Sequence, residues 1–375
     1  MRILFFIIIM VHGLIHLMGF IQGWDLGKVD QLSGNTLVPL NKNLLRAAGT
    51  GWLLATLLFL TAGAGYILEK DGWCIPALAG VVLSQILIVL YWQDAKFGTA
   101  ANLIILTVTI VGMGNTTFHR MANRELKELC SGIPEETRTV QSESLKNLPF
   151  PVRQWMEKSG VPGSPEIRSV YVKQEGEMRT TPEGKWMPLK AEQYFRTDMP
   201  GFIWIADVKA APLIHLAGRD KYMNGKGHML IKLLSLVTVA DASGRHIDQG
   251  TLLRYLGETI WFPTVTLSPY ITWESIDSLS ARATMAWGEI QASGTFLFNE
   301  QGEITGFEAD RYYTRKEGPT LERWLVEVDT DQTIESAGIR IPAGVRVTWK
   351  LDSGDFTWYR MTIKELQYNT GIPEP

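Results

Sequence analysis

Two histidines lie one helical turn apart in the first apolar segment of the chain. His12 and His16 belong to the stretch VHGLIHLMGFIQG, and this spacing puts both imidazoles on one face of a helix. Ionisable side chains are rare in apolar helices and usually functional, so the pair could mark a redox- or proton-linked site with a quinone or a shared metal ion. Alternatively, neutral imidazoles hydrogen-bond to Gln85, Asn102 or backbone carbonyls and hold the helices together.

Metal and thiol chemistry find little support in the sequence. The apolar segments of the first 115 residues contain no Asp or Glu that could complete a ligand set around the histidines. The two cysteines of the chain, Cys74 and Cys130, are too few for a disulfide framework or a metal site. We therefore expect no metal and no cofactor.

A second group of candidates is charged. Arg254 and Glu258 are four residues apart in a helix predicted over Asp248–Trp261, so they could form an ion pair on its surface. If the pair is buried beneath a sheet, Glu258 becomes a candidate acid or base. One alternative function is therefore a hydrolase-type enzyme in which Glu258, Arg254 and Asp310 converge in a pocket. The other interpretation is a pair in solvent, with Asp310 in a cross-strand ion pair.

The same helix has an apolar face. Leu252, Leu256 and Ile260 recur at helical spacing and Trp261 follows them, so this face would pack against a curved sheet. These side chains could line a hydrophobic cavity or fill a core. Our leading prediction is a membrane-tethered protein that binds a lipid or another hydrophobic small molecule through this surface, and that is not an enzyme.

Four apolar segments indicate where these residues lie. Each is close to the length of about 20 helical residues that crosses a hydrocarbon core. An even number of crossings puts the N-terminus and the C-terminal domain on one side, whereas the balanced Lys and Arg of the flanks do not indicate which side. We predict a multi-pass protein of the bacterial cytoplasmic (inner) membrane. The segments are Ile3–Gln22, Ala47–Leu68, Trp73–Trp92 and Gly98–Gly114.

The rest of the chain predicts a soluble domain rich in antiparallel β-strands. Short alternating runs are separated by turn residues, and Asn224-Gly225 is a strong hairpin signal. We expect a four-helix transmembrane module over 1–115, a polar linker with a short helix over 116–147, and an α+β domain over 148–375, formed by a curved sheet or half-barrel with an inserted helix. The net charge of −3 argues against a surface that follows a phosphate backbone, so we expect no nucleic-acid partner. The sequence does not indicate an oligomeric state.

Several segments resemble an uncharacterised bacterial membrane-protein family that joins a four-helix module to a domain of unknown function. The helical module is similar to DoxX-type membrane proteins, some of which are linked to quinone or thiol redox, although cysteine pairs are missing here. The soluble domain resembles lipoprotein-carrier (LolA-like) half-barrels, which implies a site for acyl chains. The segments are HGLIHLMGF from His12, WQDAKFGTAAN from Trp92, LPFPVRQWMEKSGVPGSP from Leu148, GKWMPLKAEQYF from Gly184, DQGTLLRYLGETIWFPT from Asp248 and FEADRYY from Phe307.

Overall fold

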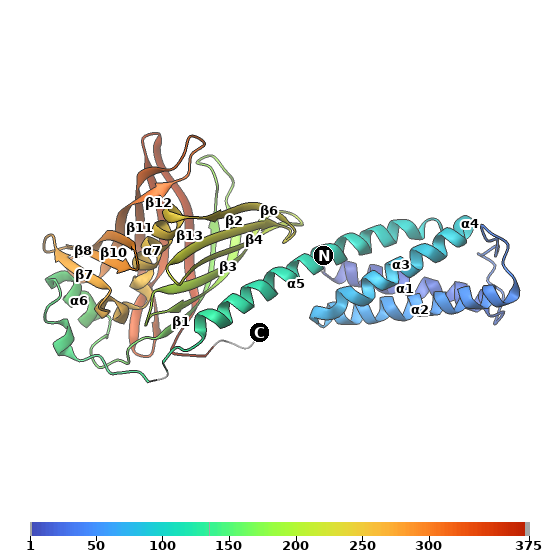
Figure 1. Cartoon of the computed structure of the whole chain (residues 1–375), viewed down its shortest axis with the longest axis horizontal. Coiled ribbons are helices and arrows are strands. Elements are labelled where there is room, and N and C mark those ends of the chain that lie inside the picture. The colour runs from blue at the N-terminus through green and yellow to red at the C-terminus, as the bar shows by residue number, and fades with distance from the viewer. Residues whose placement is uncertain (1, 135, 372–375) are drawn as a thin grey trace. The chain divides into compact units, whose positions relative to one another are not determined.

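The computed structural model describes residues 2–134 and 136–371. It divides into two compact units, Met1–Thr117 and Phe118–Pro375, and Figure 1 shows the first as a group of helices and the second as a broad sheet that curves around a helix. The predicted fold class, four apolar helices followed by a mainly antiparallel curved sheet with an inserted helix, is confirmed.

The first unit is helical. Its apolar side chains on the outer faces, such as Ile7, Leu14 and Ile86, stay exposed, as expected for side chains that face lipid. By length and composition four helices are able to cross a membrane: Arg2–Gly23, Lys42–Ile67, Asp71–Leu90 and Gly98–Cys130. The elements are α1 (Arg2–Gly23), α2 (Lys42–Ile67), a 3-10 turn (Asp71–Trp73), α3 (Cys74–Leu90), α4 (Trp92–Ala95) and α5 (Gly98–Cys130), of which residues 98–117 belong to this unit.

Close contact between α1 and α2 depends on glycine. A Cβ atom at Gly23 would lie 2.7 Å from the Cα atom of Gly49, so neither position has room for a side chain. Small residues that let two backbones approach are the usual packing device of membrane helices. This contact holds the histidine-bearing face of α1 against α2, where Phe59 and Trp52 lie beside the two imidazoles.

The second unit is built on one thirteen-stranded antiparallel sheet. Its order is β6-β5-β4-β3-β2-β1-β13-β12-β11-β10-β9-β8-β7, so the chain runs outward to one edge at β6, crosses to the other edge at β7, and returns to pair β13 with β1. The strands are β1 (Ser169–Met178), β2 (Met187–Arg196), β3 (Gly201–Ala211), β4 (Ile214–Met223), β5 (Lys226–Leu233), β6 (Val237–Ser243), β7 (Ile271–Ser275), β8 (Ser280–Trp287), β9 (Ile290–Phe298), β10 (Ile304–Tyr313), β11 (Thr320–Ser336), β12 (Ile339–Leu351) and β13 (Gly354–Tyr368).

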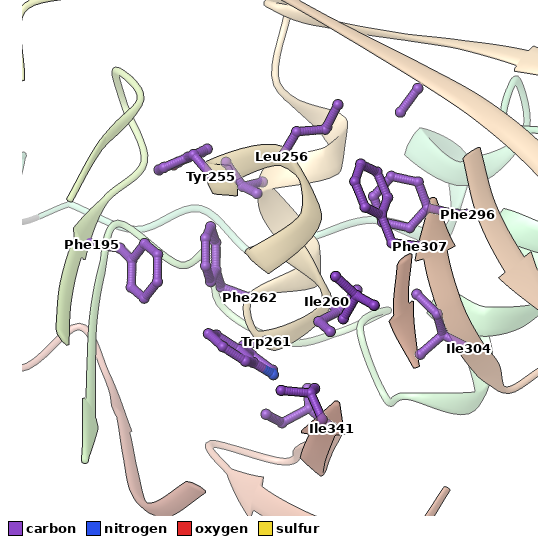
Figure 2. Close-up of a cluster of buried hydrophobic side chains, with 14 of the residues drawn as sticks. Phe195, Tyr255, Leu256, Ile260, Trp261, Phe262, Phe296, Ile304, Phe307 and Ile341 are labelled. Carbon is purple, nitrogen blue, oxygen red and sulfur yellow. The ribbon is translucent and has the colours of Figure 1, made fainter. Parts of the chain in front are cut away.

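The crossing between the two edges is the helix α7 (Arg245–Glu258), followed by 3-10 turns at Thr259–Trp261 and Pro263–Leu267. The helix contacts strands of both halves of the sheet, chiefly β5 and β9, and this requires the sheet to curve around it. Figure 2 shows side chains of α7 and the following turn between Phe195 on one side and Phe296 and Phe307 on the other. The core of the unit therefore lies between α7 and the sheet.

Local predictions agree with the structure in part. The Asn224-Gly225 hairpin is confirmed, with positive φ angles of 52° and 77°. The predicted helix Asp248–Trp261 begins three residues earlier, after Gly244, so Asp248 lies within its first turn. The buried Asp248 carboxylate accepts a hydrogen bond from the Gly227 backbone N–H at 2.8 Å and ties α7 to the β4–β5 hairpin.

Two helices differ from the sequence prediction. The short helix expected within 116–147 is the C-terminal part of α5, which runs without a break from the apolar segment to Cys130. Helix α6 (Phe150–Lys158) lies where strands were expected to begin. It buries Trp155 against Phe296, and both side chains belong to the core of the unit.

Candidate functional site

The polar residues of the helical unit meet in one hydrogen-bonded network. His12 Nε2 lies 2.9 Å from Asn102 Oδ1, and His16 Nε2 lies 2.7 Å from Ser84 Oγ. The Asn102 amide donates to Ser84 Oγ at 3.0 Å and to Gln85 Oε1 at 3.1 Å. The structure thus brings together His12, His16, Gln85 and Asn102 from α1, α3 and α5, with Ser84 between them.

Aromatic rings surround the imidazoles on their other sides. The ring centroid of Phe59 lies 5.1 Å from that of His12 and 5.4 Å from that of His16, and the Trp52 ring lies 5.0 Å from His16. Both histidines, Ser84 and Asn102 are buried within the unit. Since buried polar groups need hydrogen-bond partners, the network accounts for how these side chains are tolerated among apolar helices.

A cavity of about 330 Å³ opens beside the two histidines. This volume lies in the range of small-molecule sites. Its polar lining includes His12 and His16, and most of the other side chains that line it are apolar or aromatic. Asp94 lies at the same cavity but already accepts hydrogen bonds from Ser33 Oγ at 2.8 Å and from the Gly34 N–H at 3.0 Å. The remaining lining residues include Ile15, Met18, Gly19, Gln22, Trp52, Ile88, Tyr91, Phe97, Gly98 and Ala101.

The charged candidates of the soluble unit form a second network. Arg254 donates to Glu258 Oε1 at 2.8 Å and to Asp220 Oδ2 at 2.7 Å, and its guanidinium lies 4.9 Å from the centre of the Phe202 ring. The other Glu258 oxygen accepts from Gln193 Nε2 at 2.8 Å. The pair is therefore not in free solvent: it lies between α7 and the strands β2–β4.

Burial and charge act in opposite directions on this pair. Burial raises the pKa of Glu258, and the attraction of Arg254 offsets only part of that effect. Burial also acts to lower the pKa of Arg254, but the carboxylates of Glu258 and Asp220 raise it overall. Arg254 therefore stays positively charged, and its charge holds the two largely buried carboxylates of Glu258 and Asp220 together.

The structure does not bring Asp310 to Arg254 and Glu258. Side chains alternate along a strand, and Asp310 points away from α7, where it is exposed and lies 3.5 Å from Arg323. Its neighbour Arg311 takes the α7 side, stacked 4.9 Å from the Trp324 ring centre. Burial lowers the pKa of Arg311 to about 10. The expected three-residue pocket is thus not assembled.

The four residues expected to line a ligand cavity lie in the core of the soluble unit. Leu252, Leu256, Ile260 and Trp261 are between 0% and 4% exposed, and all belong to one continuous apolar cluster. Figure 2 shows Leu256, Ile260 and Trp261 surrounded by other core side chains. Their surfaces are therefore occupied by the protein itself.

Residues 2–134 and 136–371 hold no cluster of three or more His, Cys, Asp or Glu side chains able to share a metal ion. Both cysteines are free thiols. Sequence reasoning missed three residues of distant strands that carry no local motif: Gln193 donates to Glu258, Asp220 accepts from Arg254, and Gln174 donates to Gln193.

The fold and the first site together describe a helical unit able to cross a membrane, joined to a domain with a curved, unclosed antiparallel sheet. The chain belongs to a family of unknown function, DUF6920, whose model matches residues 146–368. The matched region does not include the helical unit, so the likeness of that unit to DoxX-type proteins stays a prediction. No curated protein matches the chain.

Two solved structures are similar to part of the chain. One is a domain named for outer membrane lipoprotein sorting, from Vibrio parahaemolyticus, with 7% identity, a TM-score of 0.31, and coverage of 55% of this chain and 88% of that chain. The other is a DUF1329 family protein from Desulfovibrio piger ATCC 29098, with 12% identity, a TM-score of 0.33, and coverage of 60% and 95%. At these TM-scores neither likeness identifies a function.

Proposed function

We propose that the helical unit binds a hydrophobic small molecule, taken from the surrounding lipid, in the cavity beside His12 and His16. The observation that carries the proposal is the cavity itself: about 330 Å³, lined by the two histidines and by mostly apolar side chains. Apolar walls with a few convergent polar groups are typical of ligand sites. A molecule with one polar end and an apolar body fits this distribution.

A purely structural role for the histidines leaves the cavity unexplained. The network already satisfies the amide of Asn102 and the hydroxyl of Ser84 with protein partners, and helices held together by such bonds pack without a void of this size. Small residues on α5, Gly98 and Ala101, border the space. A larger side chain at Ala101 would therefore enter the cavity without touching the network directly.

We place the hydrophobic ligand in the helical unit and not against α7. The surface expected to receive it, formed by Leu252, Leu256, Ile260 and Trp261, is covered by core side chains. Opening it would expose some of the largest buried residues of the domain, at roughly 1.5–3 kcal/mol for each apolar side chain. We propose that the helical unit lies in the cytoplasmic membrane, as the sequence predicts. The ligand would enter the site from the lipid of that membrane.

The test uses a photoreactive alkyl alcohol and the full-length protein in detergent micelles. We expect saturable labelling of residues at the cavity, read by peptide mass spectrometry. Ala101→Phe should abolish it by filling the space, whereas Ala100→Phe, at the exposed neighbouring position, should leave it intact. Labelling that is unsaturable, or equal in the two variants, would refute a site in this cavity.

A further inference from the structure

The hydrogen-bond network fixes which ring nitrogens carry protons. His16 Nδ1 lies 2.6 Å from the backbone oxygen of His12; a carbonyl oxygen only accepts, so this nitrogen carries the hydrogen. In a neutral imidazole the other nitrogen is then an acceptor. Ser84 Oγ, 2.7 Å from His16 Nε2, therefore donates to it.

The same reasoning passes through Asn102 to His12. The Asn102 amide nitrogen uses its two hydrogens on Ser84 Oγ and Gln85 Oε1, so its oxygen faces His12 Nε2 at 2.9 Å. An amide oxygen only accepts, and His12 Nε2 must donate to it. Both imidazoles are buried, and their hydrogen-bond partners among the described residues are neutral groups: the Asn102 amide, the Ser84 hydroxyl and a backbone carbonyl. Each is therefore neutral, since an unpaired charge is costly to bury.

These assignments leave one acceptor unused. His12 is the Nε2–H tautomer, so its Nδ1 has a free lone pair, and no group among the described residues donates a hydrogen bond to it. The residue also lines the cavity. The site thus offers an acceptor to an incoming molecule.

We infer that the ligand's polar end is a hydroxyl that donates its hydrogen to His12 Nδ1. This inference rests on the proposed function and specifies the class of molecule: an apolar body with a phenolic or alcoholic end. A head that only accepts, such as a ketone, an ether or an ester, finds no donor on His12. Donors that could serve such a head, Trp52 and Tyr91, lie along the wall of the cavity.

The experiment compares 4-hexylphenol with 4-hexylanisole, in which a methyl group replaces the donated hydrogen. Both compete with the photoreactive alkyl probe for full-length protein in micelles, and 1-decanol in a third arm separates an aliphatic from an aromatic hydroxyl. The phenol can donate a hydrogen bond to His12 Nδ1, whereas the anisole leaves this buried acceptor unsatisfied. The phenol should therefore compete at about tenfold lower concentration. Decanol competing like the phenol would assign the alcohol class in general, and decanol failing would restrict it to phenols.

The failures of the two proposals differ. Equal competition by phenol and anisole overturns the donor inference and leaves the cavity site standing, whereas no competition by any compound together with unsaturable probe labelling overturns the site. Asn102→Ala supplies a second measurement, because it frees His12 to present an N–H at either nitrogen. The preference for phenol should then fall toward unity; a preference that persists would refute the role of Asn102 in setting the tautomer.

Discussion

Replacing Glu258 by glutamine tests the direction of the hydrogen bonds beneath α7. Trp204 Nε1 donates to Gln174 Oε1 at 3.1 Å, Gln174 Nε2 donates to Gln193 Oε1 at 3.0 Å, and Gln193 Nε2 donates to Glu258 Oε2 at 2.8 Å. The chain of donors ends on a carboxylate that only accepts, and Arg254 donates to its second oxygen. An amide at position 258 has one donor too many for this arrangement.

The magnitude follows from what Glu258→Gln leaves unpaired. If the new amide keeps its oxygen toward Arg254, its nitrogen meets the Gln193 nitrogen, and one buried donor loses its partner at a cost of about 1–3 kcal/mol. The bond from Arg254 also becomes a charged-to-neutral one, which weakens it by about 1 kcal/mol. Relief from burying a carboxylate, the effect that raises the pKa of Glu258, offsets part of this. We expect a net loss of about 2 kcal/mol in the free energy of unfolding.

The assay is thermal unfolding of the full-length protein, followed by circular dichroism of the sheet domain. A loss of about 2 kcal/mol should lower the Tm by about 4–8 °C for a unit of this size. Asp310→Asn makes the same chemical change on the opposite face of the sheet, at a side chain that is 66% exposed, and should change stability by less than about 0.5 kcal/mol.

A double variant decides whether direction, and not charge alone, is the cause. Gln193→Glu combined with Glu258→Gln puts a carboxylate, which only accepts, at position 193. It can accept from Gln174 and from the new amide at position 258. Arg254 stays near, because its Nη2 lies 3.5 Å from the present Gln193 Oε1. The pair should be more stable than the sum of its single changes predicts. Additive losses, or a Glu258→Gln protein as stable as wild type, would refute the directional network.

Two further predictions concern packing and pH in the same unit. A Cβ at Gly294 would lie 2.1 Å from Phe307 Cζ, and this buried ring has no room to retreat, so Gly294→Ala should lose at least about 1–3 kcal/mol of stability in urea titrations; Ser293→Ala, on the exposed face, should not. The hydrogen bond from Lys158 lowers the pKa of Glu303, so this contact stabilises the fold above the ordinary carboxyl pKa and its contribution is lost as pH falls through the lowered value. Thermal melts from pH 7 to pH 3 should show Glu303→Gln approaching wild type at the acid end, and a constant difference would contradict this.

The sequence predicted the features that depend on short-range patterns of apolar, polar and turn residues. Four apolar segments predicted the helices, and Asn224-Gly225 predicted a hairpin, because each signal lies within a few neighbouring residues. It placed the end of the last apolar helix too early, because hydropathy changes after Gly114 while the helical backbone continues to Cys130 with no proline or glycine after that point to stop it. The change from apolar to polar residues was interpreted as the end of the helix, although the helix continues through it.

The candidate sites show the same limit. The spacing of His12 and His16 predicted one shared face, and the spacing of Arg254 and Glu258 predicted an ion pair, which the structure contains. Their other partners depend on tertiary packing: the rotation of α3 about its axis puts Ser84 and not Gln85 against His16. No local pattern could reveal that choice.

The alternative of an acid–base enzyme depends on which face of β10 the side chain of Asp310 occupies. A strand sends adjacent side chains to opposite faces, so Asp310 faces outward and Arg311 faces α7; a shift of one residue would have placed a third carboxylate near Glu258. Instead both Glu258 oxygens already accept hydrogen bonds, from Arg254 and Gln193. A general base must reach the proton that it abstracts, and here that would first require one of these bonds to break. The arrangement therefore favours Glu258 as a residue that anchors α7 to β2 through Gln193, while its partner Arg254 reaches Asp220 on β4. The Glu258→Gln and double variants test this role.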